Sequence, residues 1–334
     1  MNGAPIDFLA LFLKNELRAL ERPLGLKKIV VLSSLLLLCM SCNRVVEKWQ
    51  AGTLLYFDTV CEIKLFCSPS DFVTSKEEIR RIFQDIEKHF SPGAQSYSSA
   101  PVITLYKKSL SIYHNSQGCF DITVAPLSRL WGFRDNSHRI PTPLEIQKAL
   151  DSVGMDKIIL KSDKLFLKAG MDLDWGGIAK GLGIDQASQA MIQTGIKQGF
   201  INAGGDLYCW GWNPDQKPWR IGVKHPRTGG VSAILIISDK GAATTGDYQR
   251  FFIEEGIRYH HVFDPKSGYP AKGKQSVTVV GPETLVCDAL STALFVSHQP
   301  EKILKKFPEY GAVVIDSEGK VILIGKTYPI QLED

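Results

Sequence analysis

Hydrophobic residues recur along the chain with two different periods, and each period predicts a different element. Alternation along 53–66 predicts a pair of β-strands or one bent strand, whereas apolar positions three to four apart predict a helix over 79–90. Ser75 and Glu78 have the spacing of a capping box just before this helix, so we expect it to begin there.

The same patterns predict the elements of the remaining chain. Pro143, after Thr142 and before Glu145, opens a short helix. Longer helices are predicted over 102–115, 178–196 and 284–297, strands over 199–203, 219–224, 232–238 and 275–281, and hairpins over 158–174 and 313–324. Helices and strands mix without a regular βαβ rhythm, so we predict the α+β class, with residues 42–334 as one compact domain of two possible lobes.

The N-terminal region contains a short apolar run behind a pair of lysines. Lys27 and Lys28 precede about a dozen apolar residues, too few for a membrane span of roughly 20 but suited to a signal peptide. Ser41 before Cys42 resembles a lipoprotein cleavage box. We therefore predict a leader over 1–41, a lipid on Cys42 and a location at the periplasmic face of the membrane. A buried core helix is the alternative.

Composition and charge set limits on function. The chain has 334 residues, 44% hydrophobic and 22% charged, enough for a substantial core. A net charge of +4 and the lack of a recognisable nucleic-acid motif argue against a nucleic-acid partner. Five cysteines follow Cys42, an odd number without C-x-x-C spacing, so we expect packed thiols rather than a disulfide framework.

A glycine pair precedes the predicted helix over 178–196, within Asp172-Leu-Asp-Trp-Gly-Gly-Ile-Ala-Lys-Gly181. Glycines let the backbone approach an anion, and a helix N-terminus offers unpaired N–H groups. Lys180 in the first turn would add a full positive charge. The stretch therefore indicates a phosphate site, and a tight turn with a solvated lysine is the alternative at about even odds.

Two oxygen side chains lie on one face of the predicted helix over 284–297. Asp288 and Thr292 are four residues apart in an otherwise apolar segment. Such groups are costly to bury unless something binds them, and Mg²⁺ prefers oxygen ligands. Local capping by Asp288 and a bond from Thr292 to its own helix is an equally good interpretation.

A third stretch combines small hydroxyl residues with histidines. Thr244 and Thr245 lie beside a glycine, which suggests a loop that contacts a ligand. His260 and His261 point to opposite faces of an alternating strand, so one of them at most faces a site there. Asp264-Pro-x-x-Gly268 has the residues of a turn.

Taken together, these stretches resemble the ApbE family of FAD:protein FMN transferases over roughly 53–296. The matching segments, in order, are Phe120-Asp-Ile-Thr-Val-Ala-Pro-Leu127, Leu130-Trp-Gly-Phe133, Asp174-x-Gly-Gly-Ile-Ala-Lys-Gly181, Asn202-Ala-Gly-Gly-Asp206, Trp219-Arg-Ile-Gly-Val223, Thr244-Thr-Gly-Asp-Tyr248, His261-x-x-Asp-Pro-x-x-Gly268 and Asp288-Ala-Leu-Ser-Thr292.

The resemblance implies a mixed α/β two-lobed fold with FAD in the cleft between the lobes. It implies one Mg²⁺ held by the backbone carbonyl of Gly177 and the side chains of Asp288 and Thr292. It also implies His261 and Lys180 as the catalytic residues, with Lys180 on the diphosphate. The residues it places at FAD are Lys180, Thr244, Thr245, Asp247, His261 and Asp264. Asp264 has a turn-forming role as an equal alternative.

The implied reaction attaches FMN to a Thr or Ser hydroxyl of an exported redox-protein subunit and releases AMP. A family segment that borders the flavin is shortened after Phe90, where Ser98-Ser99-Ala100-Pro101 runs directly into a helix. This departure keeps open a Mg²⁺-dependent FAD pyrophosphatase. A non-catalytic FAD-binding lipoprotein is the third possibility, and the combination of Lys180, Asp288, Thr292 and His261 argues against it.

Overall fold

A computed structural model of the chain describes residues 46–90 and 96–332. Residues Glu47–Asp334 form one compact unit. The predicted leader and the predicted lipid site at Cys42 lie outside the described residues. Within the described ranges, none of the helices combines the length and the apolar character that a membrane span requires.

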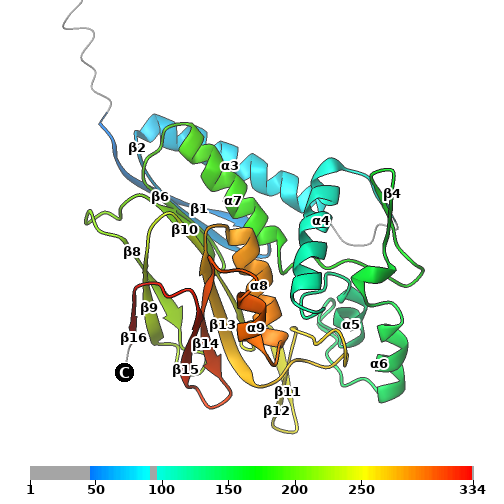
Figure 1. Cartoon of the computed structure of the whole chain (residues 1–334). Coiled ribbons are helices and arrows are strands. Elements are labelled where there is room, and N and C mark those ends of the chain that lie inside the picture. Colours follow the sequence, from blue (N-terminus) through cyan, green and yellow to red (C-terminus); the bar gives the residue numbers. More distant parts are fainter. Residues whose placement is uncertain (1–45, 91–95, 333–334) are drawn as a thin grey trace, which may run out of the picture. The chain divides into compact units, whose positions relative to one another are not determined.

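An eight-stranded antiparallel sheet forms the centre of this unit (Figure 1). Its strand order is β1-β2-β6-β7-β10-β13-β14-β15. The strands are β1 Lys48–Tyr56, β2 Thr59–Cys67, β6 Gly199–Ala203, β7 Asp206–Trp210, β10 Lys240–Gly246, β13 Lys274–Gly281, β14 Gly311–Asp316 and β15 Val321–Gly325. β1 and β2 are a hairpin, which confirms the strand pair predicted over 53–66.

Burial along the strands shows how the sheet is covered. On β2, the side chains of Cys61, Ile63 and Leu65 are fully buried while their neighbours face outward, as expected for a strand with one covered face. On β13, nearly every residue is buried, with Val279 and Val280 packed into different hydrophobic clusters. The centre of the sheet is therefore covered on both faces.

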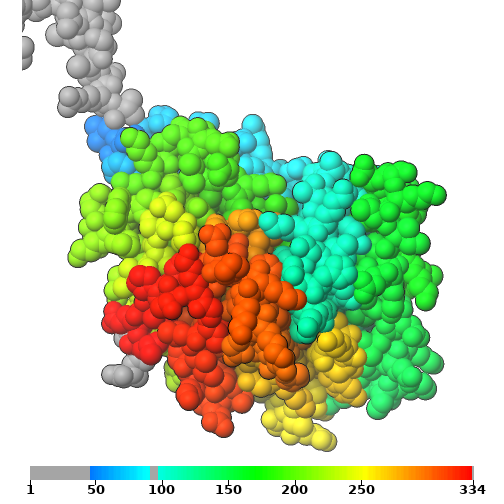
Figure 2. Space-filling view, in the orientation of Figure 1, coloured from blue at the N-terminus to red at the C-terminus, as the bar shows by residue number. Residues whose placement is uncertain are grey.

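Three long helices pack on one face of the sheet. They are α3 Pro69–His89, α7 Ala179–Gln193 and α8 Thr284–Val296. Ile79 and Phe83 of α3 join Ile184 and Met191 of α7 in one cluster with the buried side of β2. Almost all residues of α8 are buried, because the sheet lies on one side and α7, α4 (Ala100–Asn115) and α9 (Pro300–Leu304) on the others. The α4 segment lies directly against the α8–α9 segment in the space-filling view (Figure 2).

A small second sheet covers part of the opposite face. It consists of β8 Trp219–Lys224, β9 Val231–Ile237 and β16 Ile330–Leu332, in the order β16-β9-β8. Trp219 and Leu235 of this sheet pack with Phe200 and Val280 of the large sheet. This packing places β8 beside the strands that carry the candidate site.

Residues 100–168 form a mainly helical part beside the sheet. It contains α4 Ala100–Asn115, α5 Ala125–Leu130, α6 Pro143–Leu150, the 3₁₀ turn Met155–Lys157 and the strands β4 Ile159–Lys161 and β5 Lys164–Phe166. β5 pairs with β4 on one side and with β3 Ser96–Tyr97 on the other. The hairpin of β11 Phe251–Glu254 and β12 Ile257–His260 packs on it through Phe252 and Tyr259. The sheet part and this helical part are the two lobes of an α+β fold.

Two predictions about these elements need correction. Helix α3 begins at Pro69 rather than after Ser75, because Ser68 caps it by accepting a hydrogen bond from the Asp71 N–H at 3.0 Å. Ser75 is buried inside the helix. The hairpin predicted over 158–174 ends at Phe166. The short helix predicted to open at Pro143 is confirmed, and Thr142 and Glu145 form a capping box at its start.

The cysteines after Cys42 behave as predicted. Cys61, Cys67, Cys209 and Cys287 are buried and unpaired, and Cys119 is partly exposed and also unpaired. They serve as packed thiols in the described part of the chain.

Candidate active site

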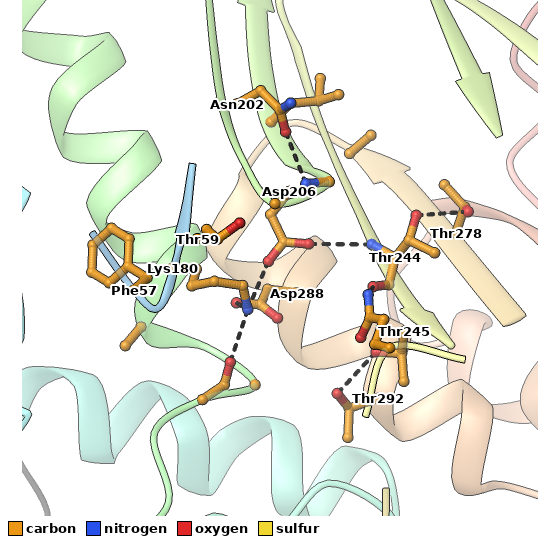
Figure 3. Close-up of a pocket in the computed structure, with 18 of the residues that line it drawn as sticks. Phe57, Thr59, Lys180, Asn202, Asp206, Thr244, Thr245, Thr278, Asp288 and Thr292 are labelled. Atoms are coloured by element: carbon orange, nitrogen blue, oxygen red, sulfur yellow. Dashed lines mark hydrogen bonds and ion pairs between the residues drawn. The ribbon is translucent and has the colours of Figure 1, made fainter. Parts of the chain in front are cut away.

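A pocket of about 1550 Å³ opens where the sheet part meets the helical part. The pocket is lined by residues from the starts of α7 and β7, from β10 and β13, from one face of α8 and from the segment after β12, together with Phe120 and Arg134 of the helical part. The pocket is larger than the few hundred Å³ typical of small-ligand sites, so it has room for a dinucleotide. Figure 3 shows its side chains.

The glycine pair before α7 shapes the pocket floor. The Gly176 N–H donates to Asp174 Oδ1 at 2.9 Å, which turns the chain into the helix. Ile178, at the N-cap, offers no capping side chain, so other groups must satisfy the N–H groups of the first turn. One of these is the N–H of Gly181, which donates to Asp288 Oδ2 at 3.2 Å.

Lys180 lies between two buried carboxylates. Its Nζ is 2.9 Å from Asp206 Oδ2 and 3.8 Å from Asp288 Oδ2, and it donates to the Gly176 carbonyl at 3.0 Å (Figure 3). Burial disfavours the ammonium, but Asp206 and Asp288 outweigh burial, so the pKa of Lys180 lies above its ordinary value. The lysine is therefore a fixed positive charge at the pocket floor.

The two carboxylates affect each other as well. Asp206 and Asp288 are 3% exposed each. Burial first, and then the negative charge of Asp206, raise the pKa of Asp288 well above that of an ordinary aspartate, while Lys180 opposes the shift. One ammonium thus faces two carboxylates, which leaves the cluster one positive charge short when both are ionised.

Gly177 and Thr292 meet across the pocket floor. A Cβ at Gly177 would lie only 3.2 Å from Thr292 Oγ1, so the backbone and the hydroxyl are neighbours. Thr292 Oγ1 is also 3.2 Å from Thr245 Oγ1, which lies 2.6 Å from Ser291 Oγ. These hydroxyls adjoin Asp288, one helical turn away on α8.

This donor set fits a hard divalent cation. It offers a buried carboxylate with unbalanced charge and hydroxyls, with the backbone of Gly177 nearby. Carboxylate, hydroxyl and carbonyl oxygens are ligands of the kind Mg²⁺ takes. Over residues 46–90 and 96–332, no three acidic, histidine or cysteine side chains gather as a metal cluster. Such a cation would therefore depend on water and substrate oxygens to complete its shell, as Mg²⁺ does.

The strand side of the pocket is polar. The Thr244 N–H donates to Asp206 Oδ1 at 3.3 Å, and its hydroxyl is 2.8 Å from that of Thr278 (Figure 3). β7, β10 and β13 are hydrogen-bonded neighbours, so they present these groups side by side. Asp206 thereby links the lysine to the threonines.

The two neighbouring histidines have different surroundings. His260 is 4% exposed, and its ring bonds to the Ala271 carbonyl through Nε2 at 2.8 Å and to the Val262 N–H through Nδ1 at 3.3 Å. His261 lines the pocket, and its Nδ1 lies 3.2 Å from the Arg250 carbonyl oxygen. Burial lowers the pKa of His261 to about 4, so its ring is neutral at pH 7. Because Nδ1 must then carry the proton, Nε2 is left as an acceptor.

The sequence comparisons identify relatives of this chain. The ApbE family model matches residues 57–314. The chain belongs to the ApbE family.

Two curated relatives are each named an FAD:protein FMN transferase. The Vibrio cholerae protein is 30% identical over 292 residues, which cover 80% of this chain and 86% of that protein. The Haemophilus influenzae protein is 34% identical over 209 residues, 59% of this chain and 60% of that protein. The second alignment thus spans less than two thirds of the relative.

Solved ApbE structures have the same fold. The ApbE protein of Thermotoga maritima superposes with a TM-score of 0.77 at 30% identity. The match covers 83% of this chain and 97% of that protein. The apo form of the flavinyl transferase ApbE of Pseudomonas stutzeri superposes with a TM-score of 0.72 at 27% identity. The match covers 83% of this chain and 94% of that protein. The predicted α+β ApbE-like fold is confirmed.

Most of the residues that the ApbE resemblance singled out gather in one place. The pocket is lined by Gly177, Lys180, Thr244, Thr245, His261, Asp288 and Thr292. The functional roles given to these residues remain predictions.

Two of the residues predicted to contact FAD, Asp247 and Asp264, do not line the pocket. Asp247 is not among the pocket-lining residues, and its carboxylate accepts two hydrogen bonds from Arg227, at 2.8 and 2.6 Å. Asp264 does not line the pocket either, and its Oδ1 accepts from the Lys266 N–H at 3.0 Å in the turn. Asp264 thus makes a hydrogen bond of the turn named as its alternative role, and an FAD contact of either residue stays a prediction.

Sequence reasoning gave no role to Asp206, which the structure places at the centre of the site. It ends the segment Asn202-Ala-Gly-Gly-Asp206, which contributed to the resemblance as a motif only. The feature that could have pointed to Asp206 is its place as a single acidic residue between a glycine pair and an apolar strand. The shortened segment after Phe90 falls largely on residues 91–95, outside the described ranges.

Proposed function

We propose that this chain is a Mg²⁺-dependent transferase that attaches FMN from FAD to a Thr or Ser hydroxyl of an exported redox-protein subunit and releases AMP. The observation that supports it best is the pocket floor, where Lys180, Asp206 and Asp288 adjoin Gly177 and Thr292. Family membership supplies the class of substrate, since the relatives are named FAD:protein FMN transferases.

The pocket suits the charge of a diphosphate. Lys180 is held as a cation at the start of α7, where the helix N-terminus adds partial positive charge. When bound, Mg²⁺ would supply Lewis-acid stabilisation of charge on the phosphate oxygens. Asp288, Thr292, Thr245 and the Gly177 carbonyl are the residues that would hold it.

The bond changes are those of a substitution at phosphorus. The acceptor hydroxyl oxygen forms a bond to the FMN phosphorus, and the bond from that phosphorus to the bridging oxygen breaks, so that AMP leaves with the electron pair. The hydroxyl proton passes to a base. His261 is the candidate, because its ring is neutral and its Nε2 is free of the bond that Nδ1 makes to Arg250.

An assay with three distinguishable outcomes tests this function. The purified full chain in detergent is incubated with FAD and Mg²⁺, with or without an exported redox subunit that has a flavinylation-type Thr site, and AMP and FMN are separated by chromatography. We expect AMP only when acceptor is present, in amounts equal to the flavin bound to it. Free FMN and AMP without acceptor would instead indicate the pyrophosphatase. FAD binding with no metal-dependent cleavage would indicate a non-catalytic flavin-binding protein.

We further propose that Cys42 is the lipidated first residue of the mature protein, at the periplasmic face of the membrane. The support is the apolar run and Ser41 before it. Labelled palmitate should enter the protein in growing cells and be lost in Cys42→Ala. Labelling that survives the substitution would exclude this anchor.

A further inference from the structure

Helices α7 and α8 meet along a ladder of contacts that ends at the proposed metal site. Residues 181 and 185 share one face of α7, and residues 284, 288 and 292 share one face of α8, because each set is spaced by four. Asp185 contacts Thr284, Gly181 contacts Asp288, and Gly177 contacts Thr292. Each step of four residues towards the start of α7 therefore meets α8 four residues, about one turn, further along its length.

The end of the ladder farthest from the pocket is a carboxylate on a helix N-terminus. Asp185 Oδ1 accepts from the Thr284 N–H and Oδ2 from the Leu285 N–H, both at 2.8 Å. Glu283, at the N-cap of α8, makes no capping bond with its own side chain. The first N–H groups of α8 are therefore capped by a residue of α7, and both carboxylate oxygens are used.

Between the two ends, the helices touch through their backbones. A Cβ at Gly181 would lie 2.6 Å from the Leu285 Cα and from the Thr284 carbonyl oxygen, closer than real contacts allow. The Gly181 N–H also donates to Asp288 Oδ2. Close approach alone allows one helix to slide along the other, whereas two bonds from one carboxylate to consecutive N–H groups fix the position along the axis.

We propose that Asp185 is a positioning residue that sets the axial position of α8, and so holds Asp288 and Thr292 against Gly177 for metal binding. Asp185 is absent from the pocket lining and acts only through α8. The inference rests on the proposed function, because it assumes that Asp288 and Thr292 bind the divalent cation.

The decisive variant is Asp185→Asn, which keeps the size of the side chain. An amide has one acceptor oxygen, and its NH₂ group would face one of the two N–H groups. Loss of a cap typically weakens a helix end by about 1 kcal/mol, so we expect Mn²⁺ to bind about 5- to 10-fold more weakly. The affinity for FAD in EDTA should not change.

Glu283→Gln is the matched control. It removes a negative charge from the same helix end, but Glu283 pairs with Lys108 on the surface and bonds to neither N–H group. If the charge alone mattered, both variants would weaken Mn²⁺ binding alike. Asp185→Ala, which removes both acceptor oxygens and adds no NH₂ group, should weaken Mn²⁺ binding as Asp185→Asn does, and it serves if Asp185→Asn does not fold.

The measurements use the full chain in detergent. Free Mn²⁺ is followed by electron paramagnetic resonance, FAD binding in EDTA by flavin fluorescence, and transfer as a function of Mg²⁺. We expect the half-saturating Mg²⁺ concentration to rise with the Mn²⁺ dissociation constant, and the rate at saturating Mg²⁺ to recover. Native Mn²⁺ affinity in the Asp185 variants, or an equal loss in Glu283→Gln, would overturn the inference. A native chain that binds no Mn²⁺ would instead overturn the metal part of the proposed function.

Discussion

Asp288→Asn is expected to reduce metal-dependent FMN transfer by at least about 100-fold, because Lewis-acid stabilisation at phosphorus is worth several kcal/mol. The substitution keeps the shape of the side chain and the acceptor oxygen for the Gly181 N–H. It removes the one charged ligand that the proposed site offers to Mg²⁺, since Gly177 and Thr292 contribute neutral oxygens.

Stability should change in the opposite direction. Burial and Asp206 hold the pKa of Asp288 above that of an unfolded aspartate, so the folded state binds this proton more tightly than the unfolded state does. Ionisation at neutral pH therefore costs folding free energy. Asp288→Asn has no such cost, and Lys180 keeps Asp206 as a partner at 2.9 Å. Without metal, the free energy of unfolding should stay equal or rise.

Chemical denaturation in EDTA and transfer assays with varied Mg²⁺ measure the two effects. Thr292 provides a matched pair: Thr292→Ser keeps the hydroxyl and should remain active, whereas Thr292→Val keeps the shape and should need more Mg²⁺. A stable Asp288→Asn protein with the native Mg²⁺ response would remove this carboxylate from the metal site. A large loss of stability would show that Asp288 is mainly structural.

The elements that could be predicted were those in which hydrophobic residues recur with a clear period. The alternation of β2 and the spaced apolar residues of α4 reflect burial on one face, whereas α8 is an apolar segment buried on nearly all sides. The predicted bounds of both helices came within a few residues of the observed ones. The start of α3 was misplaced because two Ser-x-x-acid patterns follow each other, and only the tertiary fold decides between Ser68 and Ser75. Strands β7 and β10 were not predicted at all.

The candidate site was predictable only in pieces. Lys180 and the pair Asp288 and Thr292 stood out because polar groups in glycine-rich or apolar surroundings need a reason. Their meeting depends on the close backbone contact at Gly181, which no local pattern encodes. Asp206 was missed for the same reason, since only the pairing of β7 with β10 brings it to Lys180 and Thr244.

His261→Asn is expected to slow transfer by about 100-fold or more, the usual contribution of a general base, without changing FAD affinity. Asparagine can still donate an N–H to the Arg250 carbonyl, which Nδ1 of His261 reaches at 3.2 Å, so the local fold should persist. It has no basic nitrogen to replace Nε2. Single-turnover transfer, with FAD binding measured separately, tests this.

The pH dependence gives an independent signature. Because burial lowers the pKa of His261 to about 4, the ring is the neutral base at all higher pH values and becomes protonated only as the pH falls through 4. At saturating Mg²⁺, which keeps Asp288 ionised, the native rate should therefore lose a factor of about ten per pH unit below that point, and His261→Asn should lack this inflection. Circular dichroism at each pH must show that the protein remains folded.

His260 provides the control for this experiment, because it is adjacent in the chain and differs in what it contacts. Both of its ring nitrogens are engaged by the backbone at Ala271 and Val262, and it is buried beside Phe295. His260→Asn should lower the melting temperature and leave the rate per folded molecule near native. His261→Asn should do the reverse. If the rate falls with His260→Asn and persists with His261→Asn, the base is not His261, and the neutral imidazole at the pocket wall contributes only packing.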